Sequence, residues 1–224
     1  ICLFSYMFKW YPLEKAFSIS KACGFDGLEV WGGRPHAYPF DVNPQRVLQI
    51  KALSKQYGLE IPVFTPEVLG YPYNLCSRLE KERNEAKLYL KRSLEIAAAI
   101  GAEKMLLAFD HAGYGRDQNE CRKILRDSIC ELGSYAEKCG TKLMIEAVTL
   151  MESNIVYRLE DIQDLLTAAA NDYVVAMIDT APLALHQEPF SDYVEALGTK
   201  LEHIHFVDCD GKGPHHYNIG EAGL

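Results

Sequence analysis

Short apolar segments suited to buried strands alternate with helix-forming segments along the whole chain. The expected strands cover residues 2–8, 27–31, 60–64, 104–109, 142–148, 173–179 and 201–207. The expected helices cover residues 12–23, 44–57, 80–100, 121–139 and 159–170, and a short one follows Pro189. Strands that alternate with helices in this way form right-handed βαβ units and a parallel sheet. The strands are apolar on both faces, which is typical of a sheet that helices cover on both sides.

Seven βα steps indicate an α/β fold, the (β/α)8 TIM barrel, with the eighth βα unit missing from the given chain. A doubly wound open sheet is the alternative. However, no glycine-rich phosphate loop follows the first strand, and Gly32-Gly33-Arg34 after the second lacks the G-x-G-x-x-G spacing. No linker or low-complexity tract divides the sequence. We therefore predict a single TIM-barrel domain over residues 1–224 that is C-terminally incomplete.

Composition limits the possible partners and the cellular compartment of the protein. A formal net charge of −8 argues against nucleic acid, because phosphate contacts need clustered lysines and arginines. No apolar run approaches the roughly 18 residues that a membrane-spanning helix needs, so we expect no membrane partner. Seven cysteines, an odd number without a C-x-x-C pair, are typical of reduced thiols in a cytoplasmic protein.

Polar side chains end three successive apolar strands near the end of the chain. Glu146 closes the run LMIE, Asp179 closes VVAMID, and His205 lies in LEHIHF. Because the carboxyl ends of parallel barrel strands converge on one face, we expect these side chains to meet there. Two carboxylates and one imidazole form a donor set for Mn²⁺, Mg²⁺, Co²⁺ or Zn²⁺.

Each of these three residues also has a purely structural interpretation. Glu146 alone could form a salt bridge at a strand end, Asp179 could cap a helix, and His205 could be a hydrogen-bonded core histidine. Their joint occurrence at three successive strand ends favours the metal site. The identity of the third ligand stays open, because His203 points to the same side of the strand and Asp208 follows closely.

A metal site of this composition suits two kinds of reaction. A divalent cation polarises a carbonyl or hydroxyl oxygen and stabilises a developing oxyanion, while a neighbouring carboxylate removes a proton from an adjacent carbon. This combination favours enolisation, as in isomerisation, epimerisation or dehydration of a polyhydroxylated substrate. Hydrolysis by a metal-activated water is the other use of such a site.

Further polar residues are expected on the same rim of the barrel. Trp31, Arg34 and His36 lie at and after the end of the second strand, where an aromatic ring could stack on a sugar and a guanidinium could hold an anionic group. The alternative there is a tight loop around a packed tryptophan. His111 follows the fourth strand and is a candidate substrate contact, and Glu152 follows the fifth and could accept a bond from a hydroxyl.

Five segments resemble the xylose-isomerase-like sugar phosphate isomerase/epimerase superfamily, and within it the fructoselysine 3-epimerases and related ketose 3-epimerases. They read GFDGLEVWGGRPHAYP, FTPEVLGYPYN, IEAVTLMESNIV, MIDTAP and HIHFVDCDG. The resemblance implies a (β/α)8 barrel, a small-molecule sugar substrate and inversion of a ketose carbon through an enediolate. It also implies one divalent metal ion, Mn²⁺ first, with Co²⁺, Mg²⁺, Zn²⁺ or Ni²⁺ as substitutes, and it leaves a homo-oligomer open.

The resemblance assigns roles to individual residues. Glu146 becomes a metal ligand and one of two acid/base carboxylates, Asp179 and His205 become the second and third ligands, and Glu152 contacts the substrate. Glu221 resembles the glutamate of the family's Gly-Glu-Gly signature, which reads Gly-Glu-Ala here, and is a further candidate substrate contact. The fourth ligand, which is also the second acid/base glutamate, is expected on the eighth strand beyond residue 224.

Two departures from the family pattern concern the substrate. The free-ketose epimerases carry a histidine three residues after the aspartate ligand, where this chain has Pro182. They carry an arginine six residues after the histidine ligand, where this chain has Gly211. Both departures favour a modified ketose, such as a fructosyl-amine resembling fructoselysine, over a free hexose.

The sequence therefore predicts a metal-dependent epimerase or isomerase that acts on a ketose or a fructosyl-amine. The alternatives are an inosose-type dehydratase of the same superfamily and a non-catalytic barrel that binds a sugar. A relative of the apurinic endonucleases would need more metal ligands and a basic face, against which the net charge of −8 argues.

Overall fold

A computed structural model describes residues 1–69 and 72–223, and within them seven parallel strands form one sheet in the order β1 to β7. The strands are β1 (Cys2–Phe4), β2 (Gly27–Gly32), β3 (Val63–Pro66), β4 (Lys104–Leu107), β5 (Lys142–Glu146), β6 (Val174–Asp179) and β7 (Leu201–His205). Each strand pairs with the next one along the chain, as successive right-handed βαβ units require. The predicted α/β barrel topology is confirmed over these seven strands.

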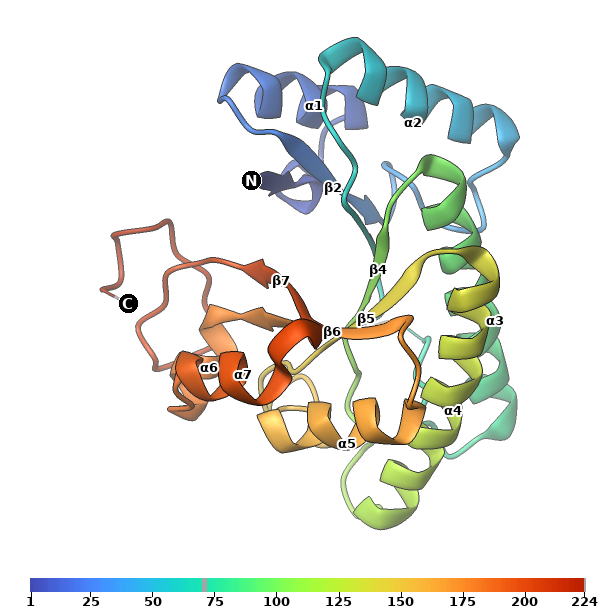
Figure 1. The fold of residues 1–224 in the computed structure, drawn as a ribbon, viewed down its shortest axis with the longest axis vertical. Coiled ribbons are helices and arrows are strands. Elements are labelled where there is room, and N and C mark those ends of the chain that lie inside the picture. The colour runs from blue at the N-terminus through green and yellow to red at the C-terminus, as the bar shows by residue number, and fades with distance from the viewer. Residues whose placement is uncertain (70–71, 224) are drawn as a thin grey trace.

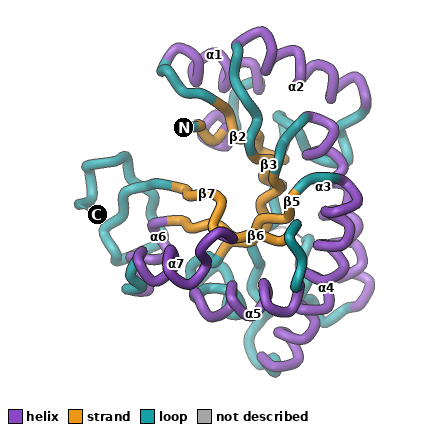
Figure 2. The backbone as a smooth tube through the Cα atoms, viewed as in Figure 1, coloured by secondary structure: helices purple, strands orange, loops and turns teal. Residues whose placement is uncertain are grey.

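Helices cover the outside of the curved sheet (Figure 1). They are α1 (Leu13–Ala22), α2 (Pro44–Tyr57), α3 (Glu80–Ile100), α4 (Gln118–Cys139), α5 (Leu159–Ala169), α6 (Thr180–His186) and α7 (Phe190–Leu197). Two short 3-10 helices, η1 (Ser5–Phe8) and η2 (Gly198–Lys200), complete the elements of the described part of the chain. Figure 2 shows the strands on the inner side of an arc of helices. None of the helices described here has the length and apolar character that crossing a membrane demands.

The apolar core has two parts, one on each face of the sheet. The larger part fills the space between the strands and the outer helices. The smaller part lies on the inner face and consists of Val63, Leu106, Met144, Val175 and Met177. Because side chains alternate between the faces of a strand, the residues two positions after Met144 and after Met177 also face inward.

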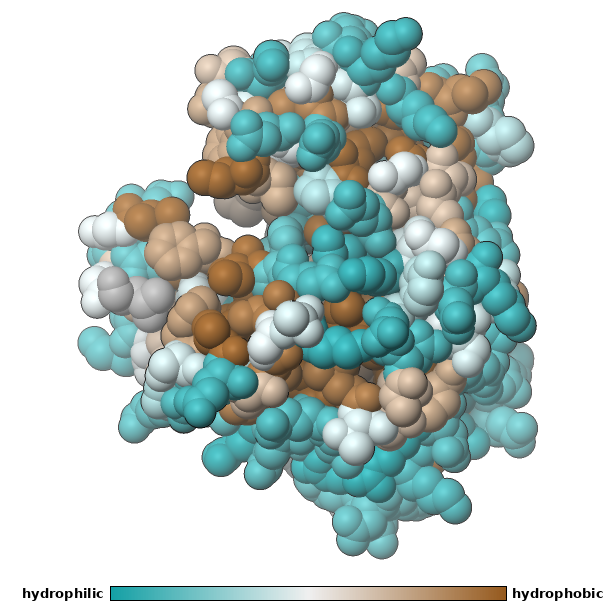
Figure 3. Space-filling view, in the orientation of Figure 1, coloured by the Kyte–Doolittle hydropathy of each residue, from teal (hydrophilic) through white to brown (hydrophobic). Residues whose placement is uncertain are grey.

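β1 and β7 are the edges of the sheet in the described residues. Apolar side chains gather on both sides of the hollow between the N-terminal and C-terminal parts of the chain (Figure 3). Ile1, Ile204 and Phe206, which lie in or next to the two edge strands, are exposed. An open edge presents unpaired backbone groups and apolar surface that a closed barrel would cover.

Several strand ends differ by one to four residues from the expectations from sequence, and one helix was not expected. The first strand ends at Phe4, because the hydroxyl of Ser5 accepts the backbone N–H of Trp31 and the chain turns into η1. The third strand occupies Val63–Pro66 rather than 60–64. Helix α6 was not expected from sequence. It begins directly after Asp179 and carries Pro182 in its first turn, where proline is tolerated. Gly70 and Tyr71, part of the FTPEVLGYPYN segment, lie outside the described residues.

Helix α4 approaches the sheet closely at Gly133. A Cβ atom at this position would lie 2.6 Å from Cγ2 of Val174, the first residue of β6. A glycine inside a helix costs about 1 kcal/mol relative to alanine, so the position is retained by contact with the strand rather than by helix propensity.

We expect Gly133→Ala to lower the free energy of unfolding by up to about 2 kcal/mol. The added methyl overpacks the contact with Val174 at a cost of about 1–3 kcal/mol, and the gain in helix propensity returns about 1 kcal/mol. Chemical denaturation monitored by circular dichroism measures this change. In a Val174→Ala background the same substitution should cost less, since the clashing methyl is gone. An equal cost in both backgrounds would contradict the proposed contact.

Candidate metal centre

The last residues of three adjacent strands lie together at the carboxyl end of the sheet. Glu146 ends β5, Asp179 ends β6 and His205 ends β7. One ligand atom of each lies within 4.8 Å of the others. Asp179 and His205 are register partners in the β6–β7 pair, so the backbone ladder itself holds them side by side.

Two of the three distances within this cluster match those between ligands of a single small cation, and the third is at most 4.8 Å. Nδ1 of His205 lies 4.0 Å from Oε1 of Glu146 and 3.9 Å from Oδ2 of Asp179. Two ligand atoms that are each about 2.1 Å from one ion lie at most about 4.2 Å apart. The set of two carboxylates and one imidazole also has the chemistry that Mn²⁺, Mg²⁺, Co²⁺ and Zn²⁺ accept. The residues present therefore fit a divalent ion.

The electrostatics of the two carboxylates favour a cation between them. Glu146 and Asp179 are only 7% and 5% exposed. Burial raises the pKa of Glu146 to about 8, and the negative charge of Asp179 adds to the rise against the opposing effect of His205. Burial also raises the pKa of Asp179, although His216 and His205 lower it. A bound cation would relieve both the desolvation and the mutual repulsion.

Asp179 combines two of the roles considered from sequence. Its Oδ1 atom accepts the backbone N–H of Ala181 at 2.8 Å and so caps α6. Its Oδ2 atom faces His205 and lies 3.6 Å from Nε2 of His216. The helix cap therefore fixes the orientation of the carboxylate and leaves one oxygen for a ligand.

His205 is held by contacts with Glu29 and Phe4. Its Nε2 atom lies 3.0 Å and 3.2 Å from the two carboxylate oxygens of Glu29, and its ring stacks on Phe4 at 5.7 Å between centroids. Burial lowers the pKa of His205, but the charge and hydrogen bond of Glu29 and the charges of Glu146 and Asp179 outweigh this and raise it to about 10. Metal binding at Nδ1 would therefore displace a proton.

Glu29 was not among the site residues predicted from sequence. This residue lies in β2 within the run GLEVWG, is 1% exposed, and accepts hydrogen bonds from Thr65, His203 and His205. Burial tends to raise the pKa of its carboxyl, but the two histidines hold that pKa well below its usual range. The only signal in the sequence was one carboxylate in an otherwise apolar strand, which identifies a buried anion but not its partners.

The structure separates the three candidates for the third ligand, which are His203, His205 and Asp208. His203 turns to Glu29, and these two residues form a second group of donor atoms with Cys2. Asp208 is buried and accepts the backbone N–H groups of residues 220, 222 and 223, so it organises the loop that follows β7. Of these residues, His205 is the one that lies beside Glu146 and Asp179.

The predicted substrate contacts after β4, β5 and β7 lie in different environments. Glu152 is held by the backbone N–H and hydroxyl of Thr149, and its charge raises the pKa of Glu146, so it lies near the cluster. Nδ1 of His111 accepts the N–H of Gly113 within its own loop. Glu221 is exposed and accepts hydrogen bonds from Asn218. The substrate roles of these residues stay predictions.

The predicted substrate contacts at and after the end of β2 form hydrogen bonds within the protein. His36 is 1% exposed, and its ring nitrogens contact the hydroxyl of Ser5 and the carbonyls of Phe8 and Tyr11. These contacts occupy both ring nitrogens within the protein, and the predicted substrate contact of His36 stays a prediction. Trp31 is also buried and donates from Nε1 to Glu67.

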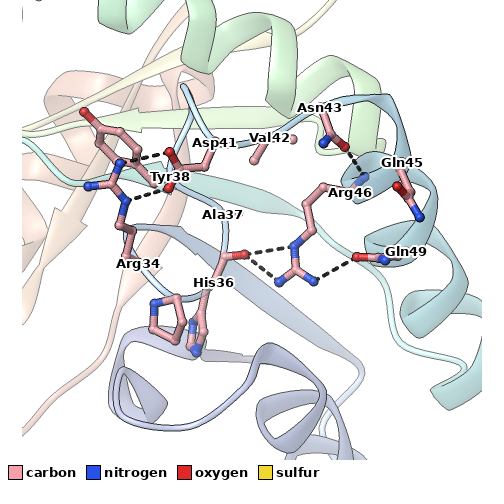
Figure 4. Close-up of a pocket in the computed structure, with 11 residues that line it drawn as sticks. Arg34, His36, Ala37, Tyr38, Asp41, Val42, Asn43, Gln45, Arg46 and Gln49 are labelled. Carbon is pink, nitrogen blue, oxygen red and sulfur yellow. Dashed lines mark hydrogen bonds and ion pairs between the residues drawn. The ribbon is translucent and has the colours of Figure 1, made fainter.

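Arg34 stays exposed and borders a separate cavity of about 490 Å³ beside α2 (Figure 4). Its guanidinium forms two hydrogen bonds with Asp41 and lies over the ring of Tyr38. On the other side of the cavity, Arg46 donates to the carbonyl of His36. The three residues of the candidate metal cluster are not among those that line this cavity.

The fold and the cluster together define a parallel α/β barrel with a carboxylate–histidine centre at the carboxyl ends of its strands. Residues 17–224 match the family described as the xylose isomerase-like TIM barrel, and the chain belongs to this family. The resemblance stated from the sequence is thereby confirmed.

Curated relatives include fructoselysine 3-epimerase of Escherichia coli O157:H7, which is 37% identical over 213 residues, 95% of this chain and 78% of the relative. D-psicose 3-epimerase of Ruminiclostridium cellulolyticum is 23% identical over 211 residues, 91% of this chain and 68% of the relative. Among solved structures, a D-tagatose 3-epimerase-like protein superposes with a TM-score of 0.87 at 18% identity, covering 100% of this chain and 81% of that one. This last likeness concerns the fold.

We expect Mn²⁺ to raise the thermal midpoint of the protein and to have little effect on Asp179→Asn. Asparagine keeps the cap on α6 but removes one charged ligand. A ligand at 100 times its Kd stabilises by about 2.7 kcal/mol, or about 5–10 °C for a protein of this size. Thermal unfolding with and without Mn²⁺ measures the difference, and equal shifts in both proteins would remove Asp179 from the ligand set.

Proposed function

We propose that this protein is a divalent-metal-dependent sugar epimerase that acts on a ketose or fructosyl-amine through an enediolate. The observation that carries the proposal is the meeting of Glu146, Asp179 and His205 within 4.8 Å at three adjacent strand ends. The 37% identity to fructoselysine 3-epimerase over 95% of the chain supports the same reaction class. The 23% identity to a D-psicose 3-epimerase agrees with it.

The proposed roles follow from the positions of the side chains. Asp179 and His205 hold the ion, and the chemistry that a bound divalent cation supplies is polarisation of the substrate oxygens next to the reacting carbon. Glu146, fixed at the end of β5, acts as a ligand and removes or returns the proton on that carbon. Glu152, held by Thr149, is positioned to accept a hydrogen bond from a substrate hydroxyl.

Inversion of a carbon needs proton transfer on both of its faces. Glu146 serves one face in this proposal. The family resemblance assigns the opposite face to a second glutamate on an eighth strand, which also supplies the fourth ligand. We also propose that residues 1–224 belong to one barrel domain, because one large apolar cluster packs the sheet against its outer helices.

A fructosyl-amine is the proposed substrate class. Pro182 is buried in the first turn of α6 and offers no side-chain donor where free-ketose epimerases carry a histidine. Gly211 has no side chain where they carry an arginine, and its φ of 65° lies in the left-handed region that favours glycine. Two polar contacts to a free sugar are thus absent, whereas the sequence relationship to fructoselysine 3-epimerase is extensive.

We expect the full-length protein with Mn²⁺ to exchange one carbon-bound hydrogen of fructoselysine for deuterium in D₂O, because enediolate formation releases the proton next to the carbonyl. Mass spectrometry after back-exchange of hydroxyl deuterium measures the incorporation. Glu146→Gln keeps the shape of the side chain but cannot take the proton, so its exchange should fall by at least about 100-fold.

The same assay separates the alternatives. Loss of 18 mass units instead of exchange, a change that follows from loss of water, would identify a dehydratase. Absence of both reactions in a protein that binds Mn²⁺ and sugar would identify a non-catalytic sugar-binding barrel. Either outcome would overturn the proposed epimerase.

We expect kcat/KM for fructoselysine to exceed that for D-psicose and D-tagatose by about 10–100-fold. A hydrogen bond to a charged group is worth about 1.5–3 kcal/mol, so the loss of one such contact accounts for a ratio of about 10–100-fold. Initial rates at limiting substrate concentration measure the ratio. Equal values would show that the residues at positions 182 and 211 do not set the preference.

A further inference from the structure

We propose that Glu29 is a positioning residue that orients His205 for metal binding from the inner face of the sheet. The inference rests on the metal centre of the proposed function and adds a residue on β2 to a centre otherwise built from β5, β6 and β7. Four strands separate β2 from β7 in the order of the sheet. The contact therefore crosses the inner side of the arc.

Both oxygens of Glu29 are used. Oε1 accepts the hydroxyl of Thr65 at 2.5 Å and lies 3.2 Å from Nε2 of His205. Oε2 lies 3.0 Å from the same Nε2 atom and 3.2 Å from Nε2 of His203. With 1% exposure, the carboxylate has no freedom to turn toward water. Its bond to Thr65 on the adjacent strand β3 fixes the orientation of the carboxylate.

The arrangement decides which nitrogen of His205 is available. Glu29 accepts only from a protonated Nε2, so in the neutral imidazole the lone pair lies on Nδ1. Nδ1 is the atom that faces Glu146 and Asp179. The ring of Phe4 stacks on the ring of His205 at an interplanar angle of 21° and limits the rotation of that imidazole. The tautomer and the direction of the ring are thus fixed together.

A carboxylate behind a ligating imidazole also raises the basicity of the ligand, and loss of such a partner typically costs 10- to 100-fold in metal affinity. A purely structural role is the competing explanation, because the same contacts tie β2 to β7. The two explanations differ in their consequences: a structural tie affects stability alone, whereas a positioning residue affects the metal and the tautomer.

The first experiment compares Mn²⁺ binding by two variants, using the EPR signal of free Mn²⁺ during titration of the metal-free full-length protein. Glu29→Gln should raise the Kd by about 10–100-fold, because a neutral amide replaces the carboxylate behind His205. Asp161→Asn is the matched control. Asp161 is also 1% exposed, but it pairs with Arg122 and the start of α5, away from the cluster. Its Kd should equal that of the unaltered protein.

The second experiment needs no variant of Glu29 and so stands even if Glu29→Gln fails to fold. Two-bond ¹H–¹⁵N spectra of the Zn²⁺-loaded protein identify the protonated nitrogen of each histidine, and His205→Gln assigns the signals of that ring. The proposal expects a proton on Nε2 and none on Nδ1. A proton on Nδ1 would overturn it.

The outcomes distinguish a failure of the metal centre from a failure of the proposed role of Glu29. If the unaltered protein binds no Mn²⁺, the metal centre and the role of Glu29 both fall. If it binds Mn²⁺ and loses binding in Asp179→Asn, the centre stands. Glu29→Gln with unchanged affinity, or with a loss matched by Asp161→Asn, would then overturn the role of Glu29 alone.

Discussion

The arrangement of this protein depends on three buried carboxylates that share one histidine. Glu29 lies on one side of His205, and Glu146 and Asp179 lie on the other. Buried anions are costly unless positive charge or hydrogen-bond donors compensate them. One imidazole compensates Glu29, together with His203, but it cannot also neutralise two more carboxylates. This excess of negative charge is the physical reason for assigning a divalent cation to the cluster.

The parallel sheet holds the buried carboxylates close together. Below the cluster, the inner face carries a small apolar layer that includes Met144 and Met177, each two residues before a carboxylate. The same period of two that buries these methionines directs Glu146 and Asp179 to the same side. The backbone ladders then keep the strand ends level, so that the polar groups meet above an apolar layer. The alternation of side chains along β5 and β6 therefore both buries the methionines and brings the carboxylates together.

Much of the fold and part of the site could be predicted from sequence. Helix α3 has the expected bounds, since its apolar face repeats at helical spacing, and the three strand-end residues meet as expected. Prediction failed where a contact over long sequence separation decided the outcome. Glu29 meets His205 across 176 residues, and the hydroxyl of Ser5 ends β1 through Trp31. Local patterns contain no information on such pairs.

By itself, the sequence determined the class of fold and the chemistry available at the strand ends, because hydrophobic periodicity and the convergence of parallel strands are local and geometric rules. The tertiary structure alone decided which polar side chains face one another. In it, His203 contacts Glu29, and His36 contacts two backbone carbonyls. Nδ1 of His205 faces Glu146 and Asp179. The physical reason is that a hydrogen bond requires its partners within about 3 Å in a defined direction, which only the closed packing of distant segments provides.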